Sequence, residues 1–254
     1  MATRLEKLAG GLGRPALITS PLPEQLADRL ASQGMESLRR RSTVSWEVPE
    51  RNLALFGFGI AAECTGPRES PLSEAVDRLR EAGAGARSGD VPAIVRPRWF
   101  GGGRFVPGGT AHDIAWDPFG GWRFLIPRVL LAVREQAAFA SLTLLTDPGG
   151  RVSEAVEAAI EEGLSGALPA GVALPSVDGF REWGRRDWEN SVRLALREME
   201  GDTLEKVVLA RSLRLATEID EGQLLSNLAE RYRQCFVFSF KGAGGTWLGA
   251  SPEL

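Results

Sequence analysis

The chain has 254 residues, a length that suits one large domain or two small ones and allows a substantial buried core. Hydrophobic residues make up 43% of it and charged residues 25%, the balance of an ordinary globular protein. Its net charge is −3, and it has no basic stripe of the kind that binding to nucleic acid or to an anionic membrane requires. We find no secretory signal and no apolar run near the roughly 20 residues of a membrane span, so we expect a cytoplasmic protein.

The first predicted elements are a helix and two strands. Leu22–Arg40 carries apolar residues at roughly helical spacing, with Gly34 weakening its middle. Val44–Val48 alternates in the manner of a strand, and Pro49–Asn52 forms a turn. Leu53–Ile60 then continues as a buried strand.

A second helix is expected to begin at Pro71, with Ser70 as its N-cap. Its buried stripe would consist of Leu72, Ala75, Val76 and Leu79. Beyond this helix we expect a short strand at Pro92–Val95 and a loop at Phe100–Phe105. Two apolar strands, Phe124–Arg134 and Ala138–Thr146, then flank a break at Glu135 and Gln136.

The second half of the chain also alternates between helices and strands. Predicted helices lie at Ser153–Glu162, from the N-cap Asp187 to Gly201, and at Leu224–Tyr232, and predicted strands lie at Lys206–Leu215, Cys235–Phe240 and Thr246–Ala250. Turn-like residues fill Asp147–Gly150 and loop-like residues fill Leu164–Asp178. Helices separating groups of strands joined by short turns indicate an α+β fold with a largely antiparallel sheet.

Two glycine-rich stretches do not meet the requirements of a nucleotide site. Gly57–Ala62 fits the loose Gly-x-Gly-x-x-Ala dinucleotide pattern, but Gly66-Pro67 ends any following helix within about a turn. We interpret it as a buried strand that contains glycines. Gly101–Gly103 is not followed by Lys-Ser/Thr, so it is interpreted as a flexible connection.

The chain is poor in the residues of histidine- or cysteine-based sites. His112 is its only histidine and lies in a polar stretch, so we interpret it as an exposed loop residue. Zinc and non-haem iron sites built on histidine are thereby excluded. Cys64 and Cys235 are far apart in sequence, and we expect two reduced, buried thiols.

The stretch around Lys206 differs because it places an amine at the start of an apolar strand. Under a period of two, Lys206 shares its face with Val208 and Ala210. Burial there would lower the lysine pKa and make the amine a usable base. The alternative, a solvated lysine at a strand start, remains open on spacing alone.

The last residues supply a carboxyl group at the end of another strand. Phe236, Phe238 and Phe240 alternate toward one face, and the glycine-rich Lys241–Gly245 allows the chain to reverse. Pro252 ends strand pairing, so Glu253 would lie at a strand end, where functional side chains are often presented.

These stretches resemble the chorismate-utilising enzymes, and within them isochorismate synthases of the menaquinone type. The resemblance is carried by Leu204–Arg211, by Phe238–Phe240 and by Leu248–Leu254, with weaker support from Val44–Glu50 and Phe124–Leu131. It implies a four-layer α/β/β/α fold with two orthogonal antiparallel sheets. It also implies chorismate as the substrate, with water adding at C2 while the C4 hydroxyl leaves.

By this resemblance, Lys206 is the general base that activates water and Glu253 is the general acid that protonates the leaving hydroxyl. Mg²⁺ would hold the substrate carboxylate, but no residue of this chain matches the family's metal ligands. A lysine rather than a glutamine at position 206 favours water over ammonia as the nucleophile. It leaves both isochorismate synthase and salicylate synthase open, in a menaquinone or a siderophore pathway.

The resemblance also indicates an incomplete fold, because family members continue well beyond the position of Leu254. We therefore expect three regions: a helical leader at 1–43, the amino-terminal half of the fold at 44–185, and a truncated catalytic region at 186–254. Alone, such a chain would be inactive, with exposed apolar surface. The alternative from another class is a non-catalytic truncated paralogue that only associates with a partner or ligand.

Overall fold

The computed structural model describes residues 16–108, 117, 119–146, 181–182, 184–201, 204–211, 213–214, 219–242 and 245–253. The chain divides into two compact units. One comprises Met1–Ala173 together with Asp220–Leu254, and the other comprises Leu174–Ile219. This division differs from the three regions expected from the sequence, because the last 35 residues belong with the amino-terminal part.

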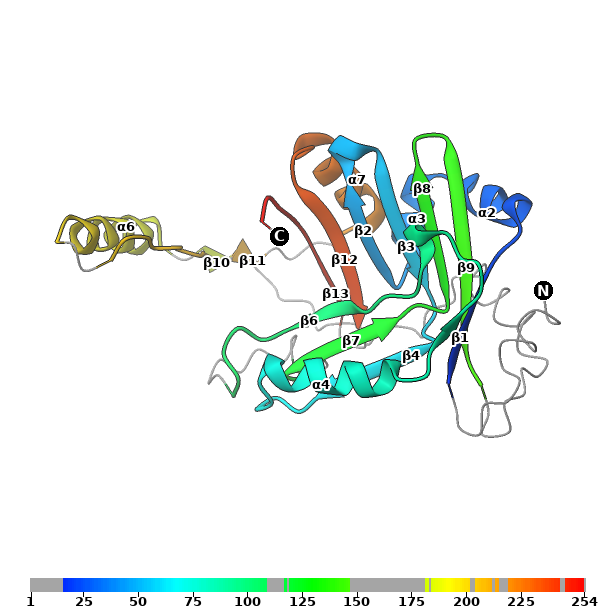
Figure 1. The fold of residues 1–254 in the computed structure, drawn as a ribbon. Coiled ribbons are helices and arrows are strands. Elements are labelled where there is room, and N and C mark those ends of the chain that lie inside the picture. The colour runs from blue at the N-terminus through cyan, green and yellow to red at the C-terminus, as the bar shows by residue number, and fades with distance from the viewer. Residues whose placement is uncertain are drawn as a thin grey trace. The chain divides into compact units, whose positions relative to one another are not determined.

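The larger unit is built on an eight-stranded sheet with the order β13-β12-β2-β3-β8-β9-β1-β5 (Figure 1). Its strands are β1 (Leu17–Pro21), β2 (Val44–Val48), β3 (Leu53–Phe58), β5 (Arg87–Ser88), β8 (Val129–Arg134), β9 (Ala137–Leu145), β12 (Phe236–Gly242) and β13 (Gly245–Ser251). All neighbours are antiparallel except β1 and β5, which confirms the predicted antiparallel sheet. The expected helical leader at 1–43 is wrong in one respect, because β1 is a buried strand of this sheet.

In the described residues, a second sheet and four helices complete the layers of this unit. The second sheet has the order β4-β7-β6, formed by β4 (Ala62–Gly66), β7 (Trp122–Ile126) and β6 (Phe100–Gly103). The helices are α2 (Glu24–Ala31), α3 (Met35–Arg41), α4 (Leu72–Gly83) and α7 (Glu221–Arg231). In Figure 1, α2, α3 and α7 cover one face of the large sheet, the small sheet lies on its other face, and α4 packs outside the small sheet. This order of layers confirms the expected α/β/β/α arrangement.

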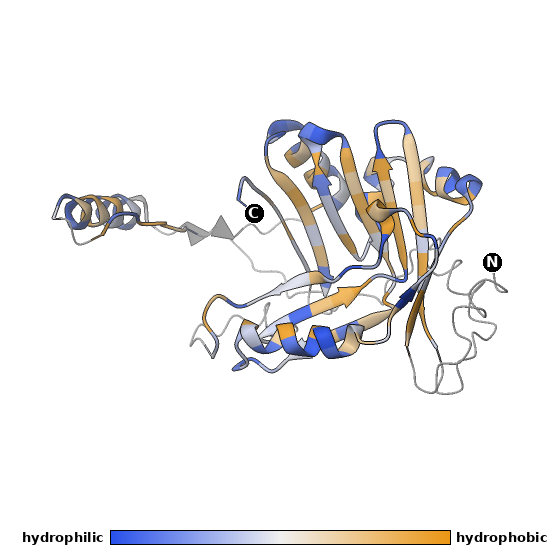
Figure 2. Ribbon diagram, in the orientation of Figure 1, coloured by the Kyte–Doolittle hydropathy of each residue, from blue (hydrophilic) through white to orange (hydrophobic). Residues whose placement is uncertain are grey.

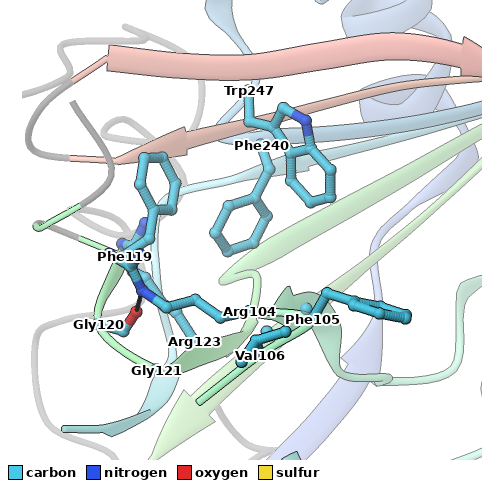
Figure 3. A pocket seen from close by; sticks show the side chains of 11 residues that line it. Arg104, Phe105, Val106, Phe119, Gly120, Gly121, Arg123, Phe240 and Trp247 are labelled. Carbon is cyan, nitrogen blue, oxygen red and sulfur yellow. Dashed lines mark hydrogen bonds between the residues drawn. The ribbon is translucent and has the colours of Figure 1, made fainter. Parts of the chain in front are cut away.

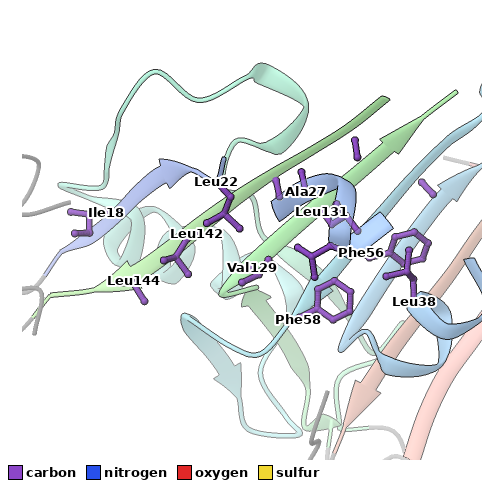
Figure 4. Packing of buried hydrophobic residues seen from close by; sticks show 14 residues of the cluster. Ile18, Leu22, Ala27, Leu38, Phe56, Phe58, Val129, Leu131, Leu142 and Leu144 are labelled. Atoms are coloured by element: carbon purple, nitrogen blue, oxygen red, sulfur yellow. The ribbon is translucent and has the colours of Figure 1, made fainter. Parts of the chain in front are cut away.

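Two hydrophobic clusters hold these layers together. The first lies between the large sheet and helices α2 and α3, and includes Ile18, Leu38, Phe56, Leu131 and Leu142 (Figure 4). The second joins the two sheets through residues such as Leu125 and Leu130. Figure 2 shows the corresponding hydrophobic colouring along the strands of the large sheet. Burial of these apolar side chains is the main stabilising contribution to the unit.

Tight turns account for the hairpins of the large sheet. Asn52 ends the 3₁₀ turn η1 (Pro49–Arg51) with φ 47°, and β3 follows it directly. Glu135 has φ 56° between β8 and β9, at the predicted break. The single strand expected over Phe124–Arg134 is in fact two strands, because Pro127 falls between β7 and β8, which belong to different sheets.

The helices of this unit depart from the sequence expectations at their ends. Gly34, with φ 83°, separates α2 from α3, so Leu22–Arg40 is two helices rather than one. The N-cap of α4 is Pro71 rather than Ser70. Of its predicted stripe only Ala75 is buried, and the side chains at positions 72 and 76 are nearly half exposed.

Two short segments differ from the structure that their sequence predicts. Pro92–Val95 contains the 3₁₀ turn η2 (Ala93–Val95) instead of a strand. Gly101–Gly103, expected to be a flexible connection, belongs to strand β6 and pairs with β7. The interpretation of Gly57–Ala62 as a strand holds only at its ends, because Gly57 and Phe58 close β3, Ala62 begins β4, and residues 59–61 link the two strands.

The smaller unit contains the helix α6 (Arg185–Glu200) and the two-residue strands β10 (Arg181–Glu182) and β11 (Leu213–Arg214). Helix α6 has Gly184 at its N-cap, three residues before the expected Asp187, and ends at Gly201 as predicted. The expected elements at Asp147–Gly150, Ser153–Glu162 and Leu164–Asp178, and His112, lie outside the described residues. None of the helices in the described ranges has both the length and the apolarity that crossing a membrane requires.

Candidate active site

The carboxyl group of Glu253 lies just beyond the hairpin formed by β12 and β13. Ser251, the last residue of β13, pairs with Phe236 at the start of β12. Its hydroxyl accepts a hydrogen bond from the Glu253 backbone N–H and donates one to the Glu253 carbonyl, each at 3.2 Å. This turn fixes the backbone of Glu253, whose side chain is exposed. The predicted position at a strand end is therefore confirmed.

A row of aromatic side chains lines the face of the hairpin that turns away from α7. Trp46 on β2 lies 5.5 Å from Phe236 and 6.0 Å from Phe238, measured between ring centroids. Phe238 in turn meets Trp247 on β13 edge to face at 5.3 Å. The predicted alternation of phenylalanines along β12 is confirmed, because Val237 on the opposite face is buried against α7. The row gives the hairpin an apolar, rigid surface.

Lys206 does not have the environment expected from its sequence. Among the described residues of the strand predicted at Lys206–Leu215, Leu213–Arg214 form β11 and residues 206–211 have no regular secondary structure. Lys206 is exposed, and so are Val208 and Ala210, its expected neighbours on one strand face. The buried strand position expected for Lys206 is therefore not what the structure shows.

Lys206 and Glu253 belong to different units of the chain, Lys206 to Leu174–Ile219 and Glu253 to the larger one. Each unit is described on its own, so a pairing between the Lys206 amine and the Glu253 carboxyl group stays a prediction. Magnesium has no matching ligand set in the described residues, where no group of three or more His, Cys, Asp or Glu side chains could hold a metal ion. We therefore derive no catalytic step through a metal.

The two cysteines are free thiols, as predicted. Cys235 is buried beside the start of β12, whereas Cys64 on β4 is only half-buried, which corrects the expectation for that residue. Burial raises the pKa of the Cys64 thiol, which disfavours the reactive thiolate. Neither cysteine has the environment of a nucleophile.

A pocket of about 360 Å³ lies beside the turn of the same hairpin (Figure 3). We call it the hairpin pocket, and its described lining consists of Gly102, Gly103, Arg104, Phe105, Val106, Phe119, Gly120, Gly121, Arg123, Phe240 and Trp247. The sequence reasoning missed these residues because the glycines were interpreted as a flexible connection. The sequence signal that could have revealed the pocket is the concentration of Gly, Arg and Phe residues in and around the segments that form β6 and β7.

Comparison with known proteins identifies the family. The family described as chorismate binding enzyme matches residues 12–254. The chain belongs to this family. Its match covers the region that contains both Lys206 and Glu253.

Two relatives of this chorismate binding enzyme are isochorismate synthases. The isochorismate synthase MenF of Bacillus subtilis (strain 168) is 26% identical over 225 residues, which are 82% of this chain and 46% of that protein. The structure of MenF, the menaquinone-specific isochorismate synthase from Escherichia coli, matches with a TM-score of 0.58 and 21% identity. That match covers 99% of this chain and 55% of the other, and it establishes the shared fold. The chain thus spans about half the length of the relatives it matches.

Proposed function

We propose that this chain forms part of a cytoplasmic isochorismate synthase, an isomerase that converts chorismate to isochorismate. The observation that carries the proposal is the family match, which runs through both candidate catalytic residues, Lys206 and Glu253. The Bacillus subtilis relative, named as an isochorismate synthase, supports this reaction over others of the family. A lysine at position 206 also favours water as the nucleophile.

The proposed reaction requires two proton transfers. In its neutral form, the Lys206 amine removes a proton from the water that attacks C2 of chorismate. The protonated Glu253 carboxyl donates a proton to the C4 hydroxyl, which leaves as water while the ring double bonds shift. The substrate and product are isomers, so no oxidant or reductant is consumed. Each positioned proton transfer contributes about 10²–10⁴-fold to such a rate.

The position of Glu253 supports its role as the acid. Its backbone is fixed by Ser251, and its side chain is exposed at the end of β13, where a substrate can reach it. Lys206 is equally accessible. We propose magnesium only for the longer protein, with ligands outside the described residues, since these residues provide no matching group.

Replacing the two residues separately tests the proposal in a protein that contains this chain together with the remaining length found in its relatives. We expect Lys206→Ala and Glu253→Gln each to lower isochorismate formation by about 10²-fold or more, because each removes one proton transfer. Isochorismate, salicylate and pyruvate are measured by chromatography during chorismate turnover.

Glu205→Gln is the matched control, because Glu205 is an exposed carboxyl group next to Lys206, and it should retain activity. Near-normal turnover by either catalytic variant would remove the role assigned to that residue. Release of salicylate and pyruvate as the main products would instead identify a salicylate synthase.

A further inference from the structure

The hairpin pocket is separate from the strand end that carries Glu253. Trp247, which lines the pocket, pairs with Phe240 near the turn of the hairpin. Ser251 lies four residues further along β13, which corresponds to about 13 Å of extended strand. Glu253 follows beyond that point, so a small ligand in the pocket would not reach its carboxyl group.

A glycine in β6 keeps this pocket open. Its neighbour Gly101 needs to be a glycine on steric grounds, because an added Cβ would come within 2.0 Å of the Arg123 carbonyl oxygen, and at Gly103 an added Cβ would lie 3.1 Å from the Gly121 carbonyl oxygen and would displace the end of the Leu72 side chain. At Gly102 the nearest atom to such a Cβ is Cζ3 of Trp247, at 3.6 Å. A side chain at position 102 would therefore fit the backbone and project toward Trp247. The absence of one leaves the space free.

Aromatic rings provide the apolar walls of the pocket. Phe119 and Phe240 lie 6.1 Å apart between ring centroids, and Figure 3 shows both beside Trp247. Gly242 permits this arrangement, since a Cβ there would approach Phe119 Cζ to 2.8 Å. Flat rings pack favourably against such walls in offset or edge-to-face geometry.

The charged side chains that line the pocket are guanidinium groups, and each pairs with a carboxylate outside the lining, Arg123 with Glu63 at 2.6 Å and Arg104 with Asp117 at 3.6 Å. The described lining of the pocket contains two guanidinium groups, from Arg104 and Arg123, and no carboxyl group. Arg123 is held in place by hydrogen bonds from Nε to Glu63 at 2.6 Å and from Nη1 to the Lys241 carbonyl at 2.7 Å. These bonds use two of its five N–H donors. Arg104 is fixed by donation from Nε to the Gly120 carbonyl at 2.8 Å.

We propose that the hairpin pocket is a second small-molecule site, which binds a ligand with a flat ring and a carboxylate. Its volume of about 360 Å³ lies within the range of small-molecule sites, which are mostly apolar with a few placed polar groups. The ring packs among Phe119, Phe240 and Trp247, and the carboxylate accepts hydrogen bonds from the guanidinium groups. This site goes beyond the proposed reaction and does not depend on Lys206 or Glu253.

Binding of 4-fluorobenzoate to the purified chain, followed by fluorine NMR, tests this site. We expect saturable binding, with acetate and benzyl alcohol competing at least about tenfold more weakly, because each supplies only one of the two required groups. Gly102→Val should weaken binding by about tenfold or more, since its methyl groups would fill the space before Trp247. Trp247→Ala should weaken binding as well, through loss of a wall of the pocket.

Gly83→Val is the matched control, because nothing lies within 4 Å of a Cβ at the end of α4. It should bind like the unmodified chain, and circular dichroism establishes that each variant is folded. Binding of 4-fluorobenzoate by the Trp247→Ala and Gly102→Val variants with the same affinity as by the unmodified chain would overturn the site. So would competition by acetate as strong as by benzoate, or no saturation up to about 10 mM. If Gly102→Val fails to fold, Trp247→Ala decides the outcome alone.

Discussion

Arg39 and Glu47 form a buried ion pair that joins three elements of the larger unit. The guanidinium of Arg39, on α3, donates to both carboxylate oxygens of Glu47, on β2, at 2.8 and 2.7 Å. A third N–H donates to the hydroxyl of Ser226 on α7 at 2.8 Å. Since the charges are buried, each depends on the other for compensation. Together with Ser226, the pair therefore connects α3 and α7 to the sheet.

We expect Arg39→Met to destabilise the chain by about 3–5 kcal/mol, because it leaves the Glu47 carboxylate buried without its partner. Urea unfolding followed by circular dichroism measures the change. Arg80→Met is the control: Arg80 pairs with Asp77 on the exposed side of α4, and its loss should change stability by about 0.5 kcal/mol or less. A loss below about 1 kcal/mol in the Arg39 variant would contradict the importance of the buried pair.

Asp220 makes the stability of α7 depend on pH. Its carboxylate is the N-cap of this helix and accepts a hydrogen bond from the Gln223 backbone N–H at 3.1 Å. This bond, followed by the interaction with Arg40, lowers the pKa of Asp220. The ionised form is therefore favoured in the folded state. Its contribution is complete above the ordinary carboxyl pKa of about 3.9 and is lost as the pH falls through the lowered folded pKa.

Asp220→Asn should remove this pH dependence, because asparagine caps a helix well but does not ionise. We expect the unmodified chain to be more stable than the variant at neutral pH, with the difference disappearing as the pH falls below about 4. Urea unfolding from pH 3 to pH 7 compares the two. A difference that stays constant across this range would show that the charge of Asp220 has no role.

At the level of elements, β3 requires a glycine at position 57. There the strand packs closely against β2 and against the segment that joins β7 of the small sheet to β8 of the large sheet. A Cβ at this position would lie 2.6 Å from Val44 Cγ1 and 2.7 Å from Pro127 Cβ, both in packed surroundings. Gly57→Ala should therefore destabilise the chain by about 1–3 kcal/mol through overpacking. Gly83→Ala should be neutral or slightly stabilising, since its Cβ meets open space. Thermal unfolding compares both, and an unchanged midpoint for Gly57→Ala would refute the prediction.

Strong local patterns made several elements predictable. Alternation predicted β2 and β12, the glycine-rich reversal at Lys241–Gly245 predicted the returning strand β13, and the break at Glu135 predicted the turn between β8 and β9. Residues 100–103 were missed because glycine has a weak strand preference, and its pairing with β7 depends on the tertiary fold. The opposite error occurred at Lys206. The side chains there alternate as in a strand, but a strand also needs a neighbouring strand to pair with. Strand β11 pairs with β10 at two residues.

For the whole molecule, the resemblance to a family predicted the order of layers, which periodicity alone did not. The sequence pattern predicts helices between groups of antiparallel strands, an arrangement that several folds share. The place of β1 inside the large sheet could not be predicted, because its pairing with β9 joins residues 120 to 128 positions apart. The position of Glu253 at a strand end was predictable from Pro252. The surroundings of Lys206 were not.

We expect the 254-residue polypeptide by itself to form no isochorismate from chorismate. The chain spans about half the length of its relatives, and the Lys206 side chain is exposed in the described structure. Incubation of the purified chain with chorismate and Mg²⁺, followed by chromatography, measures this. Isochorismate formation that disappears in Glu253→Gln would contradict the prediction and show that this length is sufficient.

The pairing of β2 with β12 also has a consequence for the time course of biosynthesis. Glu47 on β2 pairs with Val237 on β12, 190 residues later in the sequence. At translation rates of about 5–20 residues per second, roughly 10–40 s separate the synthesis of these two positions. During that interval, β3 is the only one of its two strand neighbours that β2 can pair with. The carboxylate of Glu47 is not yet shielded from water by α7 and β12. A nascent chain on the ribosome would therefore keep one side of β2 open until almost all of these residues have emerged.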